Sequence, residues 1–154
     1  MIIAEVAPED PRLPAVFEVM RELRTHLSLD DFRRLYGEAQ AEGYRVAAVF
    51  EGDECRAVAG YRTMVNMTSG RHVYVDDLVT AERWRSHGYG RQLNEYLVQR
   101  AHDQGCGSIQ LDSWVHRADA HHFYFREHYR IMGFHFGRYF DGAPRAPEPP
   151  KDPR

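Results

Sequence analysis

The segment Arg85–Gly90, with the sequence RSHGYG, is the part of this chain best suited to binding a charged ligand. It lies between a strand-like stretch that ends near Val79 and a helix-like stretch that begins near Gly90. A glycine-rich turn that opens a helix leaves backbone N–H groups without partners, and the positive end of the helix dipole adds to their attraction for anions. We therefore predict that this turn binds the phosphate groups of a cofactor.

Acidic side chains near the ends of adjacent predicted strands are candidate bases. Asp76 and Asp77 precede the glycine turn, and Asp112 follows the next apolar run. A carboxylate there would attract an ammonium group and could accept its proton through water. Because strand side chains alternate, we expect Asp76 and Asp77 to point to opposite faces unless a bulge intervenes. Asp76 is the first candidate base and Asp112 the second, with Asp77 as the alternative; each could instead cap or pair near a strand end.

A group of histidines raises the question of a metal site. Metal ligands on one helix lie three or four residues apart, so that both rings reach one ion. The histidines of this region do not have that spacing: His116, His121, His122, His128 and His135. We predict no metal here and consider His121 or His122 as substrate contacts, with a solvated helix face as the simpler interpretation.

The composition predicts one compact domain. The chain has 154 residues, of which 43% are hydrophobic and 28% charged, and this length is enough to bury a core. Its net charge of -3 argues against a nucleic-acid partner. Cys55 and Cys106 lack metal or redox spacing, which favours a reducing compartment. No window of about 18 apolar residues is present, so we expect a cytoplasmic protein with no membrane partner.

The first part of the sequence predicts a strand and two helices. Residues 2–6 alternate weakly, as a first or edge strand does. Asp10 followed by Pro11 is typical of a helix start, and the apolar stripe that follows continues to about residue 26. Ser28 and Asp31 form a capping pair for a second helix, which Gly43 closes.

The remaining elements complete a mixed α/β (α+β) domain over residues 1–143. A hairpin signal and a strand–loop–helix unit predict the order βααβββαβαβ, with helices on both faces of the sheet. The predicted ranges are strands 44–51, 56–64 and 71–80, helix 90–104, strand 108–114, helix 117–129 and a last strand near 134–140. Five of the residues 144–154 are proline, so we expect a disordered tail there.

These features resemble the GNAT superfamily of N-acetyltransferases, whose cofactor loop reads Gln/Arg-x-x-Gly-x-Gly/Ala after the fourth strand. Arg85, Gly88 and Gly90 match that loop, and residues 78–80 occupy the Leu-x-Val place before it. The resemblance covers residues 1 to about 140. It implies a single GNAT-like domain with a mostly antiparallel sheet, acetyl-CoA as cosubstrate, and dimers as a common assembly.

The resemblance also assigns the cofactor contacts. It implies that loop groups hold the pyrophosphate of acetyl-CoA, namely Arg85, Ser86, His87, Gly88, Tyr89, Gly90 and Arg91. It further implies that pantetheine lies between two splayed strands, against the backbone of Leu78, Val79 and Thr80. An amide there would stabilise charge that develops on the thioester oxygen, typically by about 3 kcal/mol per donor.

The family's general acid is a tyrosine in the pattern Ala-x-x-Phe-Tyr-x-x-x-Gly-Phe, and this sequence offers two registers. Matching the front half, from Ala120, makes Tyr124 the acid, whereas matching Gly133-Phe134 to the end makes it Tyr129. Tyr124 lies twelve residues after Asp112, as the family pattern requires. Five residues of helix separate the two hydroxyls by about 500° and about 7.5 Å of rise, so they cannot share one role. We prefer Tyr124 and keep Tyr129 as the alternative.

The function predicted from these observations is acetyl transfer from acetyl-CoA to a primary amine by direct attack. Cys106 has no evident base beside it, which disfavours an acyl-enzyme. The acceptor can be a small molecule or a peptide amine. The alternative is a catalytically silent acyl-CoA binding or sensing module on the same fold, since a fold does not guarantee chemistry.

Overall fold

The computed structural model describes residues 1–142. The proline-rich stretch 144–154, for which we expect disorder, lies outside the described residues. The chain divides into two compact units, Met1–Leu111 and a second that begins at Asp112. Throughout the described part of the chain, no helix combines the length and apolar character needed to cross a membrane.

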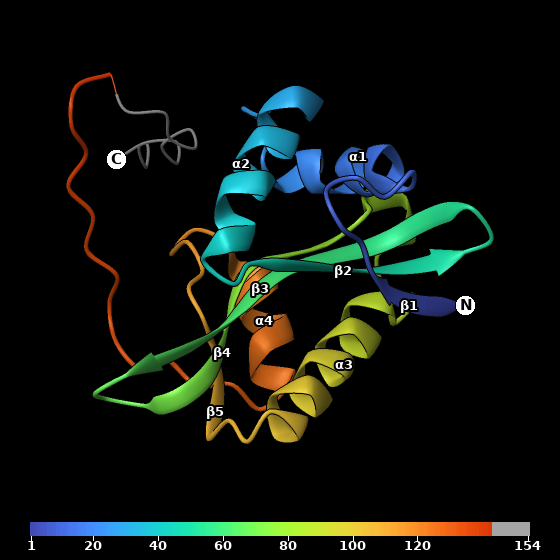
Figure 1. Ribbon diagram of the computed structural model, residues 1–154. Helices are drawn as coiled ribbons and strands as arrows, with labels where there is room; N and C mark the ends of the chain where they lie inside the picture. The colour runs from blue at the N-terminus through green and yellow to red at the C-terminus, as the bar shows by residue number, and fades with distance from the viewer. Residues whose placement is uncertain (143–154) are drawn as a thin grey trace, which may run out of the picture. The chain divides into compact units, whose positions relative to one another are not determined.

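The first unit contains one five-stranded sheet whose spatial order follows the chain (Figure 1). Its strands are β1 (Ile2–Glu5), β2 (Arg45–Glu51), β3 (Glu54–Asn66), β4 (Gly70–Thr80) and β5 (Ser108–Leu111). The first three pairings are antiparallel, and only β4 and β5 run parallel. A parallel pair needs a long crossover, which the helix between β4 and β5 provides. The predicted mixed, mostly antiparallel sheet is confirmed.

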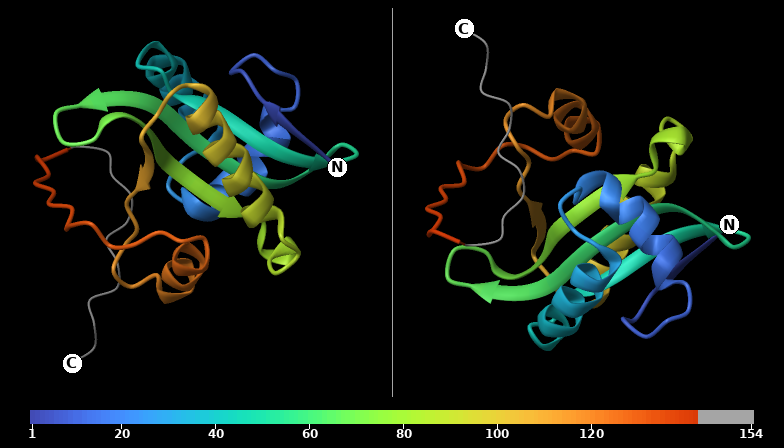
Figure 2. Two further views of the ribbon diagram at one scale, coloured as in Figure 1. Left: turned by 90° about the horizontal axis from the view of Figure 1, so that it is seen from below. Right: turned by 90° about the horizontal axis from the view of Figure 1, so that it is seen from above.

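Helices cover both faces of this sheet. Helices α1 (Leu13–Leu23) and α2 (Leu29–Ala41) lie on one face, and α3 (Tyr89–Asp103) crosses the other (Figure 2). Alternate residues of β2 separate the two cores: Val46 and Ala48 pack with α1 and α2, whereas Ala47 and Val49 pack with α3. This alternation is the period of a strand buried on both sides, and it confirms the predicted fold class.

The helix starts agree only partly with the predictions. The capping box of α2 is present, because Asp31 N–H donates to Ser28 Oγ at 3.1 Å and Ser28 N–H donates to Asp31 Oδ2 at 3.2 Å. Helix α1 begins later than predicted. Asp10 binds the backbone N–H and guanidinium of Arg12 rather than capping a helix, and Pro14 takes the proline position of the first turn.

The end of the described chain departs from the predicted order. No strand forms at residues 134–140 within the described range, so the last predicted strand is wrong. Apolar alternation indicates that a segment can join a sheet, but a strand forms only where another backbone pairs with it. Residues 131–140 are instead exposed. β5 also ends before Asp112, and helix α4 (Ala118–Arg126) is shorter than predicted at its end.

Two β-bulges interrupt the sheet, and each contains a charged residue. Between β3 and β4, Gly60 pairs with Asp77 and the next residue pairs with Val75, which leaves Asp76 as the extra residue. Between β2 and β3, the pairing shifts in the same way and leaves Arg56 as the extra residue. A bulge re-aims side chains and is common beside functional sites.

Gly60 is required beside the first bulge. A Cβ at this position would lie 1.9 Å from the Tyr44 hydroxyl oxygen and 2.6 Å from Asp77 Oδ2. Neither group can move aside without breaking the hydrogen bond of 2.6 Å that joins them. The absence of a side chain at Gly60 therefore makes room for this buried polar pair.

We predict that Gly60→Ala lowers the free energy of unfolding by about 3 kcal/mol, because the added methyl overpacks a buried site. Urea denaturation measures the change. Gly37→Ala is the matched control: it lies within α2 with nothing within 4 Å of an added Cβ, so it should raise stability by about 0.5–1 kcal/mol. Equal stability of Gly60→Ala and the wild type would contradict the packing argument.

Candidate functional site

The glycine turn adopts the backbone conformation that a helix-entry loop needs. After β4 the chain makes a short 3-10 turn, η1 (Glu82–Trp84), and enters α3 through residues 85–88. Ser86 and Gly88 both have positive φ, 64° and 86°. Glycine adopts this left-handed region without steric cost, whereas Ser86 adopts it against the contact between its Cβ and the backbone. The loop is thus a sharply turned segment.

The start of α3 presents backbone donors. Its first helical hydrogen bond runs from Gln92 N–H to the Gly88 carbonyl at 3.0 Å. The N–H groups of Tyr89, Gly90 and Arg91 precede that bond, so they have no partner within the helix. Gly88 is the N-cap residue and offers no side chain in their place. This geometry suits an anionic ligand.

The β4 strand has an edge that its neighbour does not cover. Pairing between β4 and β5 begins at His72 with Ser108 and stops at Val75 with Leu111. β4 continues to Thr80 and stays paired with β3 on its other side. Among the described residues, no strand pairs with residues 76–80 on the β5 side. The predicted positions Leu78, Val79 and Thr80 lie in this stretch, where an extended ligand could add like a strand.

The bulge at Asp76 reverses the alternation of side chains along β4. Val75 packs on the α3 side of the sheet, whereas Val79, four residues later, packs on the α1 and α2 side. Regular alternation would place both on one side. The contacts of Asp76 and Asp77 lie together on the α1 and α2 side. The bulge is the exception stated for the predicted alternation, so the two side chains do not point to opposite faces.

Each of the two carboxylates is held by an arginine. Asp77 accepts from Arg24 Nε at 2.6 Å and from the Tyr44 hydroxyl at 2.6 Å. Asp76 accepts two bonds from Arg62, both at 3.0 Å, and the guanidinium of Arg62 lies 5.5 Å from the centroid of the Tyr44 ring. Arg24 also donates to the Asp76 carbonyl at 2.9 Å. The carboxylates therefore belong to one network and form no unbalanced acidic patch.

Burial changes the proton affinity of this network. It raises the pKa of Asp76, and the opposing effect of Arg62 is smaller. Burial, together with the neighbouring carboxylate of Asp77, raises the pKa of Tyr44 well above its usual value. Asp76 thus holds a proton more readily than an exposed aspartate does.

The network residues beyond the aspartates were not predicted from the sequence. Arg24 follows α1, Tyr44 precedes β2, and Arg62 lies in β3. Arg24 is 53 residues from its partner Asp77, and Tyr44 is 33 residues from it. No local spacing connects such residues; only the strand order brings them together.

In the second unit, Tyr124 and Tyr129 lie side by side. Helix α4 ends at Arg126, and His128 takes a left-handed φ of 67°. The chain then turns back, so that Tyr129 N–H donates to the Tyr124 carbonyl at 2.9 Å and the ring centroids are 5.7 Å apart. The predicted separation of the tyrosines along one helix is therefore wrong. Burial raises the pKa of both hydroxyls.

The other predicted side chains of this unit have local partners. Asp112 Oδ2 lies 3.0 Å from His135 Nδ1, and both residues are exposed. The His121 ring lies 2.9 Å from the Trp114 carbonyl. Within residues 1–142, no group of three or more His, Cys, Asp or Glu side chains is arranged to hold a metal ion.

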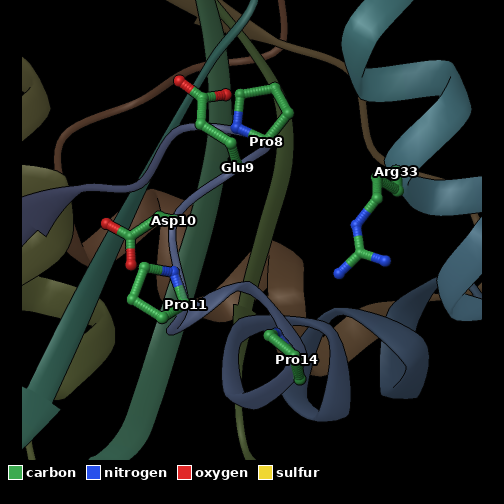
Figure 3. A pocket seen from close by; sticks show the side chains of 6 residues that line it. All are labelled: Pro8, Glu9, Asp10, Pro11, Pro14 and Arg33. Atoms are coloured by element: carbon green, nitrogen blue, oxygen red, sulfur yellow. The ribbon is translucent and has the colours of Figure 1, made fainter.

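A separate open cavity of about 520 Å³ lies between the β1–α1 connection and α2 (Figure 3). Three prolines, two acidic residues and an arginine line it: Pro8, Glu9, Asp10, Pro11, Pro14 and Arg33. None of these residues belongs to the predicted site. The Asp10 carboxylate is already bonded to Arg12.

Comparison with known proteins identifies the family. Residues 13–129 match the family model described as the acetyltransferase (GNAT) family. An uncharacterized N-acetyltransferase of Bacillus subtilis (strain 168), YhdJ, is 38% identical over 109 residues, which are 70% of this chain and 77% of that protein. This chain belongs to the GNAT family of acetyltransferases, as its loop and strand order predict.

Solved structures have the same fold at low sequence identity. An aminoglycoside N-acetyltransferase, AAC(6′)-Iy, in complex with CoA matches with a TM-score of 0.79 and 13% identity, over 91% of this chain and 94% of that one. Glucosamine-6-phosphate N-acetyltransferase from Arabidopsis thaliana matches with a TM-score of 0.72 and 20% identity, over 91% and 98%.

We predict that His128→Gly raises the free energy of unfolding by about 1 kcal/mol, because glycine removes the steric cost of the left-handed conformation at an exposed position. Thermal and urea denaturation measure the gain. Ala120→Gly, within α4, is the control and should lower stability by about 1 kcal/mol. A loss of stability in His128→Gly would show that its backbone carries no such strain.

Proposed function

We propose that this protein transfers an acetyl group from acetyl-CoA to a primary amine by direct attack. Membership of the GNAT family supports acetyl transfer. The observation that carries the proposal is the pairing of two backbone features: the donors at the start of α3 and the uncovered edge of β4 that leads to them. The donors at the start of α3 suit a diphosphate, and the free edge of β4 suits an extended chain that ends in a thioester.

The loop residues are assigned to the diphosphate. The amides of residues 86–91 and the guanidinium of Arg85 would hold it, and the backbone of residues 78–80 would hold pantetheine. The fit is supported at Gly88, where an added Cβ would meet only the Gln92 side chain, at 3.9 Å. The surface above this residue is therefore open to a phosphate. Bound acetyl-CoA supplies the activated acetyl group.

Asp76 is assigned as the base, acting through water on the acceptor ammonium. An amine with a pKa near 10.4 is only about 0.04% neutral at pH 7, a cost of roughly 4.6 kcal/mol that the site must offset. The raised pKa of Asp76 makes it a better proton acceptor than an exposed aspartate. Asp77, bonded to Arg24 and Tyr44, is assigned to holding the bulge. Asp112 stays the second candidate base.

Tyr124 is assigned as the acid that protonates the departing thiolate. Its raised pKa keeps the hydroxyl protonated at neutral pH. The conformation of His128 supports this register, because His128 stands where the family pattern has glycine and adopts the left-handed φ that glycine favours. Tyr129 remains the alternative acid.

A small-molecule amine is the proposed acceptor class, with peptide amines as the second class to test. Two proteins of the same fold are named for small amines, an aminoglycoside and glucosamine 6-phosphate. In this chain, Arg24 and Arg62 balance the charges of Asp76 and Asp77. These four residues carry no net negative charge, so we do not expect their charge to select the acceptor.

The test of the function is binding followed by turnover. Calorimetry and thermal shift should register binding of acetyl-CoA and not of ATP. Release of the coenzyme A thiol should then accelerate with at least one member of a panel of aminosugars, aminoglycosides, polyamines and short peptides. No binding of acetyl-CoA would contradict the proposal, and binding without turnover on any amine would instead favour a silent binding module.

We predict that Tyr124→Phe lowers kcat by about 10²–10⁴-fold, the usual contribution of a general acid, while the Kd for coenzyme A stays the same. Steady-state kinetics and calorimetry separate the two effects. Tyr129→Phe is the matched control, since the Tyr129 ring packs against the Tyr124 ring. If Tyr129→Phe carried the loss and Tyr124→Phe did not, the assignment would move to Tyr129.

A further inference from the structure

The bulged residue Arg56 ties the β2–β3 hairpin to the chain that enters the glycine loop. As the extra residue between β2 and β3, Arg56 lies outside the regular ladder. Its carbonyl accepts the Ala81 N–H at 2.9 Å, at the point where the chain leaves β4. Its side chain is buried. The backbone of the bulge therefore contacts the segment that leads from β4 to the glycine loop.

The Arg56 guanidinium stacks on the ring of Trp84, which directly precedes the loop. The guanidinium carbon lies 3.6 Å from the centroid of the ring. Glu54 holds both partners, since its carboxylate is 2.6 Å from Arg56 and accepts the Trp84 indole N–H at 3.2 Å. A cation over an indole face is strongest where the cation is shielded from water, and Arg56 is buried.

A row of aromatic rings continues this contact across the loop. The His87 ring meets Trp84 edge-on, with centroids 5.7 Å apart, and stacks on Tyr89 at 6.3 Å. Tyr89 is the buried first residue of α3. Burial and a hydrogen bond with Glu51 raise the pKa of its hydroxyl. Both ends of the loop thus contact the end of the β2–β3 hairpin.

We propose that Arg56 and Trp84 are positioning residues that hold the loop in its coenzyme-binding conformation, an inference that rests on the proposed function. We call this pair of residues the clamp. Two arginines and two glutamates meet here: Arg56, Arg83, Glu51 and Glu54. Their charges sum to zero, so the cluster adds little attraction for a phosphate. It acts by shape, because Ser86 keeps its strained φ of 64° only while the surrounding contacts fix the turn.

The test uses two acetyl donors with Arg56→Met, which keeps the length of the side chain and removes the stacking cation. Acetyl-CoA engages the loop, whereas S-acetyl-N-acetylcysteamine has the thioester end without the diphosphate. We expect the Kd and KM for acetyl-CoA to rise about tenfold, the scale of a desolvated cation–π contact. We expect kcat, and kcat/KM for the short thioester, to stay the same.

A second arginine supplies the matched control. The guanidinium carbon of Arg12 lies 5.0 Å from the centroid of the Phe50 ring, and Arg12 pairs with Asp10, so Arg12→Met should leave both donors unaffected. Trp84→Phe keeps an aromatic face and should raise the KM for acetyl-CoA by less than Arg56→Met does. Arg56→Gln, which also removes the cation, replaces Arg56→Met if the latter does not fold by circular dichroism.

The outcomes separate the two proposals. Normal acetyl-CoA binding by the folded Arg56 variant overturns the clamp alone. An equal loss with both donors also overturns it, because that result indicates general damage rather than a displaced loop. Failure of the wild-type protein to bind acetyl-CoA overturns the proposed function and the clamp together. A loss confined to acetyl-CoA supports the clamp.

Discussion

The hydrogen bond from Tyr44 to Asp77, buried against Gly60, is the interaction on which the acceptor side of the proposed site depends. It forms where β4 contains an extra residue, and it fixes Asp77 in a position that also receives Arg24 from the end of α1. A buried carboxylate without these partners would cost several kcal/mol. The network thus connects α1, the start of β2 and the β4 strand at one point. These contacts also fix the face of the sheet on which the Asp76 side chain lies.

The same structural device is used twice in this sheet, once beside each part of the proposed site. The bulge at Asp76 places a carboxylate on the α1 and α2 face, and the bulge at Arg56 places a guanidinium under the turn that leads to α3. In a regular ladder each would follow the alternation of its neighbours. An extra residue changes that alternation at one position while the rest of the strand stays buried.

Local signals made part of this structure predictable. The capping box at Ser28 and the glycine turn at Gly88 depend on residues within four positions of each other, so the sequence reveals them directly. The bulges do not have such a signal. One inserted residue moves the side chains that follow it to the other face of the sheet, but it leaves the composition of the strand unchanged. The end of α4 was not predicted for a related reason. A left-handed residue after a helix is usually a glycine, but here it is His128. The Tyr44–Asp77 and Arg24–Asp77 contacts depend on strand order, which a single sequence specifies only through the whole fold.

The two sides of the proposed site use different kinds of chemical group, and this difference has a consequence for how the protein could change. Coenzyme A would be held mainly by backbone N–H groups, whose positions depend on the turn and on the Arg56–Trp84 stack beneath it. Substitution of an exposed loop side chain leaves those donors in place. The acceptor would meet side chains such as Asp76, which Arg62 holds and whose replacement would alter charge and shape directly. If the proposed site is correct, acceptor choice would therefore vary through few substitutions, whereas donor binding would be preserved as long as the sheet holds the loop.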